Sequence, residues 1–196
     1  MRMVEFWGLL YKRRCCLVYK KKNRIIKNYK WNKIWSRDGF PKVNFFFWIL
    51  AHRKALTAEN LGKRGIVGLL RCILCKEEEE IIVHVFTECK FTQKVWREVL
   101  KELKMNITLP TNWNEIFFSW NDFYQGSLNK NPYFSIAWDA LPRFVCWKIW
   151  NARNKEIFEG KIDCFKKVSA ATKNLWVDTL AIRGMKNIIN EPLMVE

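Results

Sequence analysis

The sequence predicts a mainly α-helical fold, in which a small helical domain built around clustered cysteines is followed by a helical extension. Apolar residues recur at helical spacing over 91–103 and again over 163–183. Residues that favour helix starts and ends flank other segments. Pro41 precedes the longest apolar run, residues 45–51, and Gly160 follows a second apolar segment. These patterns place helices on both sides of the cysteine-containing segment 71–90.

The composition is that of a folded chain. The 196 residues suffice for one domain, or for one domain with a helical extension. Hydrophobic residues make up 49% of the chain, including 11 Trp and 14 Phe, and so much aromatic surface would not stay solvated in a disordered chain. No run of 18 apolar residues occurs, so we expect no membrane span.

Residues 1–30 form a basic leader with interleaved aromatic residues. Residues 1–37 hold 12 Lys and Arg against one Glu, which is +11 of the net charge of +16. A one-signed arm favours a polyanionic partner, with nucleic acid (RNA or single-stranded DNA) before an anionic membrane. The leader cations that we expect to contact nucleic acid are Lys12, Arg13, Arg14, Lys20, Lys21, Lys22, Arg24, Lys27 and Lys30.

The compact part is expected to begin at Trp31. A helix should start near Pro41 and, because residues 45–51 are apolar on most faces, become the buried central element. Thr57 is expected to cap the short helix AENLGKR, which should end at Gly65. After the cysteine segment, Phe91 to Leu103 should form an amphipathic helix.

The remaining chain is expected to add helices. Residues 105–131 should form a connector with one short helix in NWNEIFFSWNDF, and residues 132–183 a helical pair. Pro142 should start or kink the first helix of the pair, which runs to Gly160. Residues 184–196 are expected to be a frayed tail.

Seven cysteines without an export signal indicate a reducing compartment, nuclear or cytoplasmic, although a mitochondrial presequence is an alternative reading of the start. In that setting clustered cysteines more often hold metal than form disulfides. Cys146 and Cys164 are interpreted as small core residues.

The metal motif consists of Cys72, Cys75, His84 and Cys89. A C-x2-C pair lets two thiolates converge from one tight turn, and a His and a Cys five positions apart can both face inward from a turn or from the start of a helix. Three thiolates and one imidazole complete a zinc tetrahedron without an open position, so the site is interpreted as structural. The alternative is three buried cysteines beside a surface histidine.

Other polar features are given ordinary structural interpretations. His52 is expected to be exposed or to cap a helix, and the acidic run 77–80 to be a solvated loop rather than a second metal site. A phosphate-binding glycine-rich loop, a G-x-S-x-G motif and paired aspartates of the polymerase kind are all missing from the sequence. We therefore expect no catalytic residues and no enzyme activity.

Residues 31–104 contain, in order, the segments WNKIW, PKVNFFFWILAHRKALTAENLGKRG, CILC, EIIVHVFTEC and Val95–Trp96. In these segments the chain resembles a known family, the zinc-binding domain that follows the reverse transcriptase in non-LTR (LINE-type) retrotransposons, which are abundant in plant genomes. The family's Cys, Cys, His and Cys are taken to hold zinc, and they correspond one for one to the four residues of the metal motif. A weaker similarity, in FVCWKIWNARNKEIFEGK, is to a helical segment that leads toward a ribonuclease H-like domain.

The resemblance implies a non-catalytic zinc-binding module that contacts nucleic acid, with Zn2+ as its cofactor. The alternative is a structural or protein-interaction domain that docks on a reverse transcriptase or another protein. A retroelement fragment without a selected function is part of that alternative.

Overall fold

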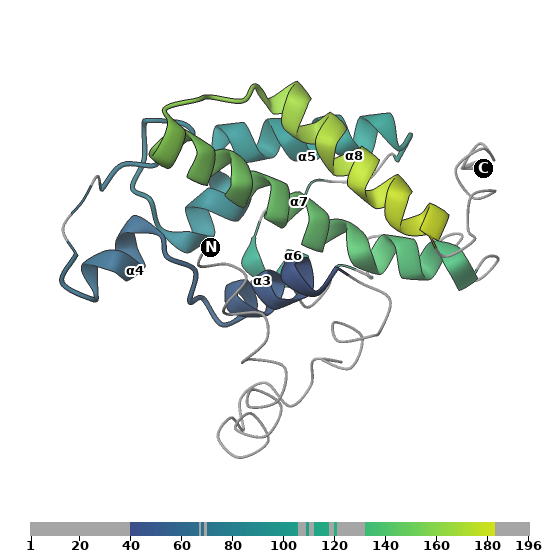
Figure 1. Cartoon of the computed structure of the whole chain (residues 1–196), viewed down its shortest axis with the longest axis horizontal. Coiled ribbons are helices and arrows are strands. Elements are labelled where there is room, and N and C mark those ends of the chain that lie inside the picture. The colour runs from purple at the N-terminus through teal and green to yellow at the C-terminus, as the bar shows by residue number, and fades with distance from the viewer. Residues whose placement is uncertain are drawn as a thin grey trace, which may run out of the picture.

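The computed structural model describes residues 40–66, 68, 70–105, 109, 112–117, 120 and 132–182. Within these ranges the protein is mainly helical, as predicted, and its helices other than α4 share one hydrophobic core. The long helix α7 (Pro132–Glu159) runs through the middle of the molecule, with α5 (Lys90–Glu102) and α8 (Phe165–Ile182) along one side of it and α3 (Pro41–Ala51) on the other (Figure 1). None of the described helices is long and apolar enough to cross a membrane.

Helix α3 begins where the sequence predicted. Pro41 occupies the first turn, where its missing N–H costs no hydrogen bond. The buried face includes Phe46 and Phe47, and it packs on α7 and α6 (Trp113–Phe117). The Phe46 ring lies 5.3 Å from the Trp150 ring, and the Phe47 ring stacks at 4.5 Å on Phe117.

The short helix α4 (Ala58–Gly62) has Thr57 at its N-cap position, as predicted, but Thr57 makes no side-chain capping bond. The chain leaves the helix through Gly65, whose φ of 78° lies in the left-handed region that favours glycine. The amide of Ile66 donates to the carbonyl of Leu61 across this turn. The predicted end at Gly65 therefore corresponds to the glycine turn that follows the helix.

Helix α5 has the predicted amphipathic character. Val95, Trp96, Val99 and Leu100 are buried, and α8 packs along the helix. In α8, Val168 and Trp176 are buried as the spacing predicted. Burial of these two apolar stripes against each other and against α7 fixes the three-helix layer.

Helix α7 begins at Pro132 and carries Pro142 inside it, so Pro142 does not start the helix. A proline in a helix has no N–H for the carbonyl four residues earlier, here that of Trp138. The indole N–H of Trp120 donates to this carbonyl at 2.9 Å, and that of Trp176 donates to the neighbouring carbonyl of Ala137 at 2.7 Å. The missing N–H of Pro142 thus leaves the Trp138 carbonyl available to the indole of Trp120, and α8 is bonded to α7 at the adjacent carbonyl of Ala137.

The helical extension and the cysteine segment share the same core. Phe86, beside the metal motif, lies 6.3 Å from the Trp150 ring of α7, and buried Arg143 of α7 donates to the side-chain oxygen of Asn44 in α3 at 3.2 Å. Described residues of all three predicted segments, 31–104, 105–131 and 132–183, therefore contribute to one hydrophobic core.

Candidate metal centre

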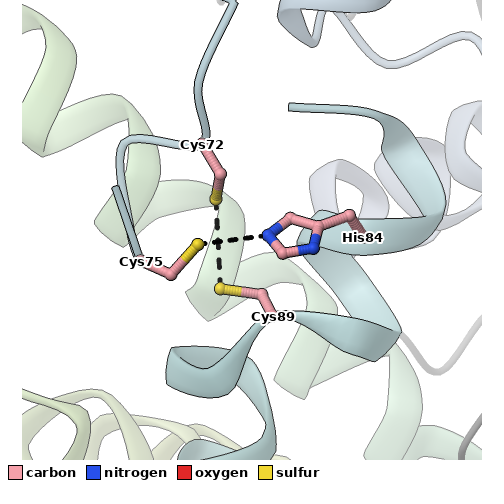
Figure 2. Close-up of side chains that lie close together, drawn as sticks. All are labelled: Cys72, Cys75, His84 and Cys89. Carbon is pink, nitrogen blue, oxygen red and sulfur yellow. Dashed lines mark hydrogen bonds between the residues drawn. The ribbon is translucent and has the colours of Figure 1, made fainter. Parts of the chain in front are cut away.

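The four residues of the metal motif lie together, and their side chains converge from three segments of the chain (Figure 2). One donor atom from each lies within 4.8 Å of all the others. Cys72, His84 and Cys89 are buried, and Cys75 is half-buried. Within the described residues this is the one group of three or more His, Cys, Asp or Glu side chains arranged to hold a metal ion.

A tight hairpin positions the first two thiols. Arg71 and Glu79 form an antiparallel bridge at its base, and the amide of Cys72 donates to the carbonyl of Glu78 at 2.7 Å. The turn closes when the amide of Lys76 donates to the carbonyl of Cys72 at 2.7 Å, with Lys76 in the left-handed region at φ 62°. The hairpin therefore aims both thiols of the C-x2-C pair toward the same point.

A π-helical turn, η2 (His84–Glu88), positions the other two side chains. In an α-helix, residues five apart point about 140° away from each other. Here the amide of Cys89 donates to the carbonyl of His84 at 2.8 Å, the i to i+5 bond of a π-turn. The wider turn brings the imidazole and the thiol to one side, which explains how the five-residue spacing supports a shared site.

The distances fit a tetrahedral zinc ion. Bonds of about 2.3 Å to sulfur and about 2.0 Å to nitrogen predict edges of about 3.8 Å between two sulfurs and about 3.5 Å between sulfur and nitrogen. The Sγ atoms of Cys72 and Cys89 are 3.9 Å apart, and the Sγ of Cys75 is 3.3 Å from the Nε2 of His84. The donor set and its spacing are therefore suited to a bound metal ion.

Without metal, neighbouring groups shift the pKa values of the clustered side chains in different directions. The hydrogen bond to Cys89 and burial raise the pKa of Cys72 to about 12, and hydrogen bonds to the thiol groups of Cys72 and Cys75 raise that of His84 to about 9. The hydrogen bond from Cys72 lowers the pKa of Cys89, and the amides of Thr92 and Phe91 at the start of α5 act in the same direction. Zinc needs thiolates and a neutral imidazole, so binding releases protons and zinc affinity should rise with pH.

The prediction that residues 77–80 form a solvated loop is wrong for one of the four. Glu77, Glu78 and Glu79 are exposed, but Glu80 is buried. Both Glu80 carboxylate oxygens accept from the guanidinium of Arg153 in α7, which is also buried. One of them accepts the amide N–H of Ala58 at 2.9 Å as well. Glu80 thus joins the metal hairpin to α7 and caps α4, the role that was predicted for Thr57.

Sequence reasoning missed the pair of Glu80 and Arg153. A signal for it was present, because Arg153 follows Ile149 by four residues and adjoins Ala152, on the apolar side of a helix that was expected to be buried. A charge in such a place requires a partner. The sequence offered four consecutive glutamates and gave no means of choosing among them.

Other predicted residues have different outcomes. Cys146 is buried as expected, whereas Cys164 is exposed, because it precedes α8 and its carbonyl accepts the amides of Lys167 and Val168 at the start of that helix. His52 lies at the C-cap of α3 with its ring beside that of Trp48. All nine leader cations lie outside the described residues.

Comparisons with known proteins agree with the metal motif. Residues 6–96 match the family model described as "zinc-binding in reverse transcriptase", which confirms the resemblance to a retrotransposon-type zinc-binding domain. An Arabidopsis thaliana protein named "Putative ribonuclease H protein" is 21% identical over 137 residues, covering 70% of this chain. The chain spans about a fifth of that relative's length, 21%. No solved structure matches the chain.

Proposed function

We propose that this chain is a non-catalytic zinc module that binds nucleic acid, because residues 6–96 match the family model for zinc binding in reverse transcriptase. Its zinc ligands in this proposal are Cys72, Cys75, His84 and Cys89. The observation that carries the proposal is the set of four donor atoms, all within 4.8 Å of one another. Two of the pairs, Cys72 with Cys89 and Cys75 with His84, lie at the separations of a zinc tetrahedron.

The closed donor set supports a structural role for the metal. Catalytic zinc keeps one coordination position for water or substrate, and three thiolates with one imidazole fill all four. Many described carboxylates are also engaged by cations, including Glu80 by Arg153, and Asp163 by Lys155 and Lys167. Such pairing supports structural use of these acids, in contrast to the facing carboxylates that a two-metal site requires.

We expect the purified chain to show no ribonuclease H cleavage and no nucleotide incorporation with Mg2+ or Mn2+. The relative that is named a ribonuclease H protein is much longer, and this chain spans only 21% of its length. The measurement is cleavage of a labelled RNA–DNA hybrid and extension of a primed template by homogeneous protein. Reproducible turnover that is abolished by substituting one Asp or Glu would show an active site and contradict the non-catalytic assignment.

The charge of the chain supports nucleic acid as the partner. We expect affinity for short RNA or DNA to fall steeply with salt, because Lys and Arg release counterions from phosphates. Replacing Lys20, Lys21, Lys22 and Arg24 with Ser should flatten the slope of log Kd against log salt and weaken binding equally across sequences. Native mass spectrometry, with and without chelator and then with RNA and DNA oligonucleotides, measures zinc and nucleic acid on the same chain.

The alternative, a docking module for another protein, has a specific observation in its favour. Phe158 is 78% exposed at the end of α7, and Leu70 is 71% exposed at the base of the metal hairpin. These apolar side chains lie on the two elements that Glu80 and Arg153 join. If nucleic-acid binding is absent at low salt, while zinc remains bound, the docking function is favoured.

A further inference from the structure

The solvent face of α5 carries a row of cations. Lys90, Lys94, Arg97 and Lys101 are all exposed, and their spacing of four, three and four residues places them within an arc of about 60° on the helix. The row is about 17 Å long at 1.5 Å per residue. Lys104, also exposed, lies two residues beyond the end of the helix. We call these five residues the α5 cationic row.

Most of the row has no anionic partner within the described part of the chain. Lys90 pairs with Glu77, and Lys94 stands over the ring of Phe165 at 5.9 Å. Arg97, Lys101 and Lys104 form no ion pair with any described residue. Glu102, a neighbouring acid on α5, is engaged at 3.5 Å by Lys173 of α8.

The first part of the row lowers the stability of its own helix, whereas Lys101 lies in the last turn, where the helix dipole favours a cation. Like charges three and four residues apart repel each other, and cations near the N-terminus of a helix face the positive end of its dipole. Lys90 is the first residue of α5, and Lys94 lies one turn further on. A polyanion laid along the row would relieve both effects.

From this geometry we propose that the α5 cationic row binds the phosphate backbone of nucleic acid. The proposal rests on the proposed function and adds to the leader a second contact surface, which lies within the described residues. The metal centre fixes the position of the row, because Cys89 is the N-cap residue of α5. Helices α7 and α8 pack against α5.

The opposite face of α5 favours nucleic acid over an anionic membrane. An interfacial helix binds lipid by inserting its apolar side into the bilayer. Here the apolar side, Val95, Trp96, Val99 and Leu100, is buried in the protein core. The half-buried Phe91 is the one aromatic ring on α5 besides Trp96, so the row offers phosphate contacts without base stacking, and it should bind without sequence preference.

The test compares two full-length, zinc-loaded variants with the parent chain. The row variant is Arg97→Gln, Lys101→Gln and Lys104→Gln, three residues without described ion pairs. The matched control is Lys42→Gln, Lys54→Gln and Arg64→Gln, which removes the same charge from exposed positions on the α3 and α4 side of the molecule. Each is titrated with a mixed-sequence RNA oligonucleotide over a range of salt concentrations, and with phosphatidylserine vesicles.

The row variant should lose about 2 from the slope of log Kd against log salt for single-stranded RNA, at about 0.7 per phosphate contact. Its affinity at low salt should fall at least tenfold, and the control should keep the parent slope. Two results would refute RNA binding by the α5 cationic row without affecting the proposed function. One is an equal loss of salt slope and RNA affinity in both variants, and the other is a row variant that binds RNA as the parent does. A row variant that loses vesicle binding alone would overturn it too.

A parent chain that binds no RNA at low salt would overturn both proposals. A second measurement does not depend on substitutions. Bound RNA should protect Lys101 and Lys104 of the parent from acetylation, whereas Lys42 and Lys54 should react as in the free chain. Equal reactivity of all four lysines with and without RNA would contradict the row.

Discussion

Removal of zinc should unfold the protein as a whole rather than the hairpin alone. Structural zinc contributes on the order of 10 kcal/mol in small modules, which is comparable to the full stability of a domain. The metal centre shares its core with α7 and α8, and the Phe86 ring beside the centre lies near the Trp150 ring of α7. We therefore expect one zinc per chain and a single cooperative loss of helical circular dichroism and Trp fluorescence after chelation.

Single substitutions sharpen this prediction. Cys72→Ser and Cys89→Ser should abolish tight zinc binding and unfold the chain, because each removes one ligand from a closed set. Cys164→Ser is the matched control, since Cys164 is exposed and lies outside the cluster, and it should keep both zinc and the melting temperature. A metal-free protein that melts like the zinc-loaded one would refute the site.

The grouping of the four candidate ligands and several helices were predictable because their sequence signals are local. The C-x2-C spacing and the stripe of Val95, Trp96 and Val99 depend on residues within one turn or one helix. The sequence also predicted the helix start at Pro41, where the fixed φ of proline acts on the backbone directly. The start after Thr57 was predicted too, but the side chain that caps α4 is that of Glu80.

Features that depend on tertiary packing could not be read from the sequence. Pro142 was expected to start or kink a helix, but the helix extends back to Pro132, and the carbonyls around the proline are used by Trp120 and Trp176. The π-turn that joins His84 to Cys89 has no sequence signature of its own. Packing against the rest of the fold decides in both cases which local geometry is adopted.

The buried pair of Glu80 and Arg153 should be the most sensitive point of the fold outside the metal centre. Removal of one partner leaves an uncompensated buried charge, and such substitutions typically cost about 3–5 kcal/mol. We expect Arg153→Met to lower the free energy of unfolding by this amount in the zinc-loaded chain, as measured by urea denaturation. The same variant should also lose zinc to a competing chelator more readily, because Glu80 ends the hairpin that holds Cys72 and Cys75.

Glu80→Gln tests the charge separately from the capping bond. Glutamine keeps an oxygen that can accept the amide of Ala58, so the single variant loses the charge, and the double variant Glu80→Gln with Arg153→Met should recover much of the stability. The control is Lys161→Met at the exposed pair with Glu159, where side chains 69% and 55% exposed predict a change below about 0.5 kcal/mol. If Arg153→Met costs no more than this control, the pair does not hold α7 to the metal hairpin. Additive losses in the double variant would show that the two side chains stabilise the fold independently.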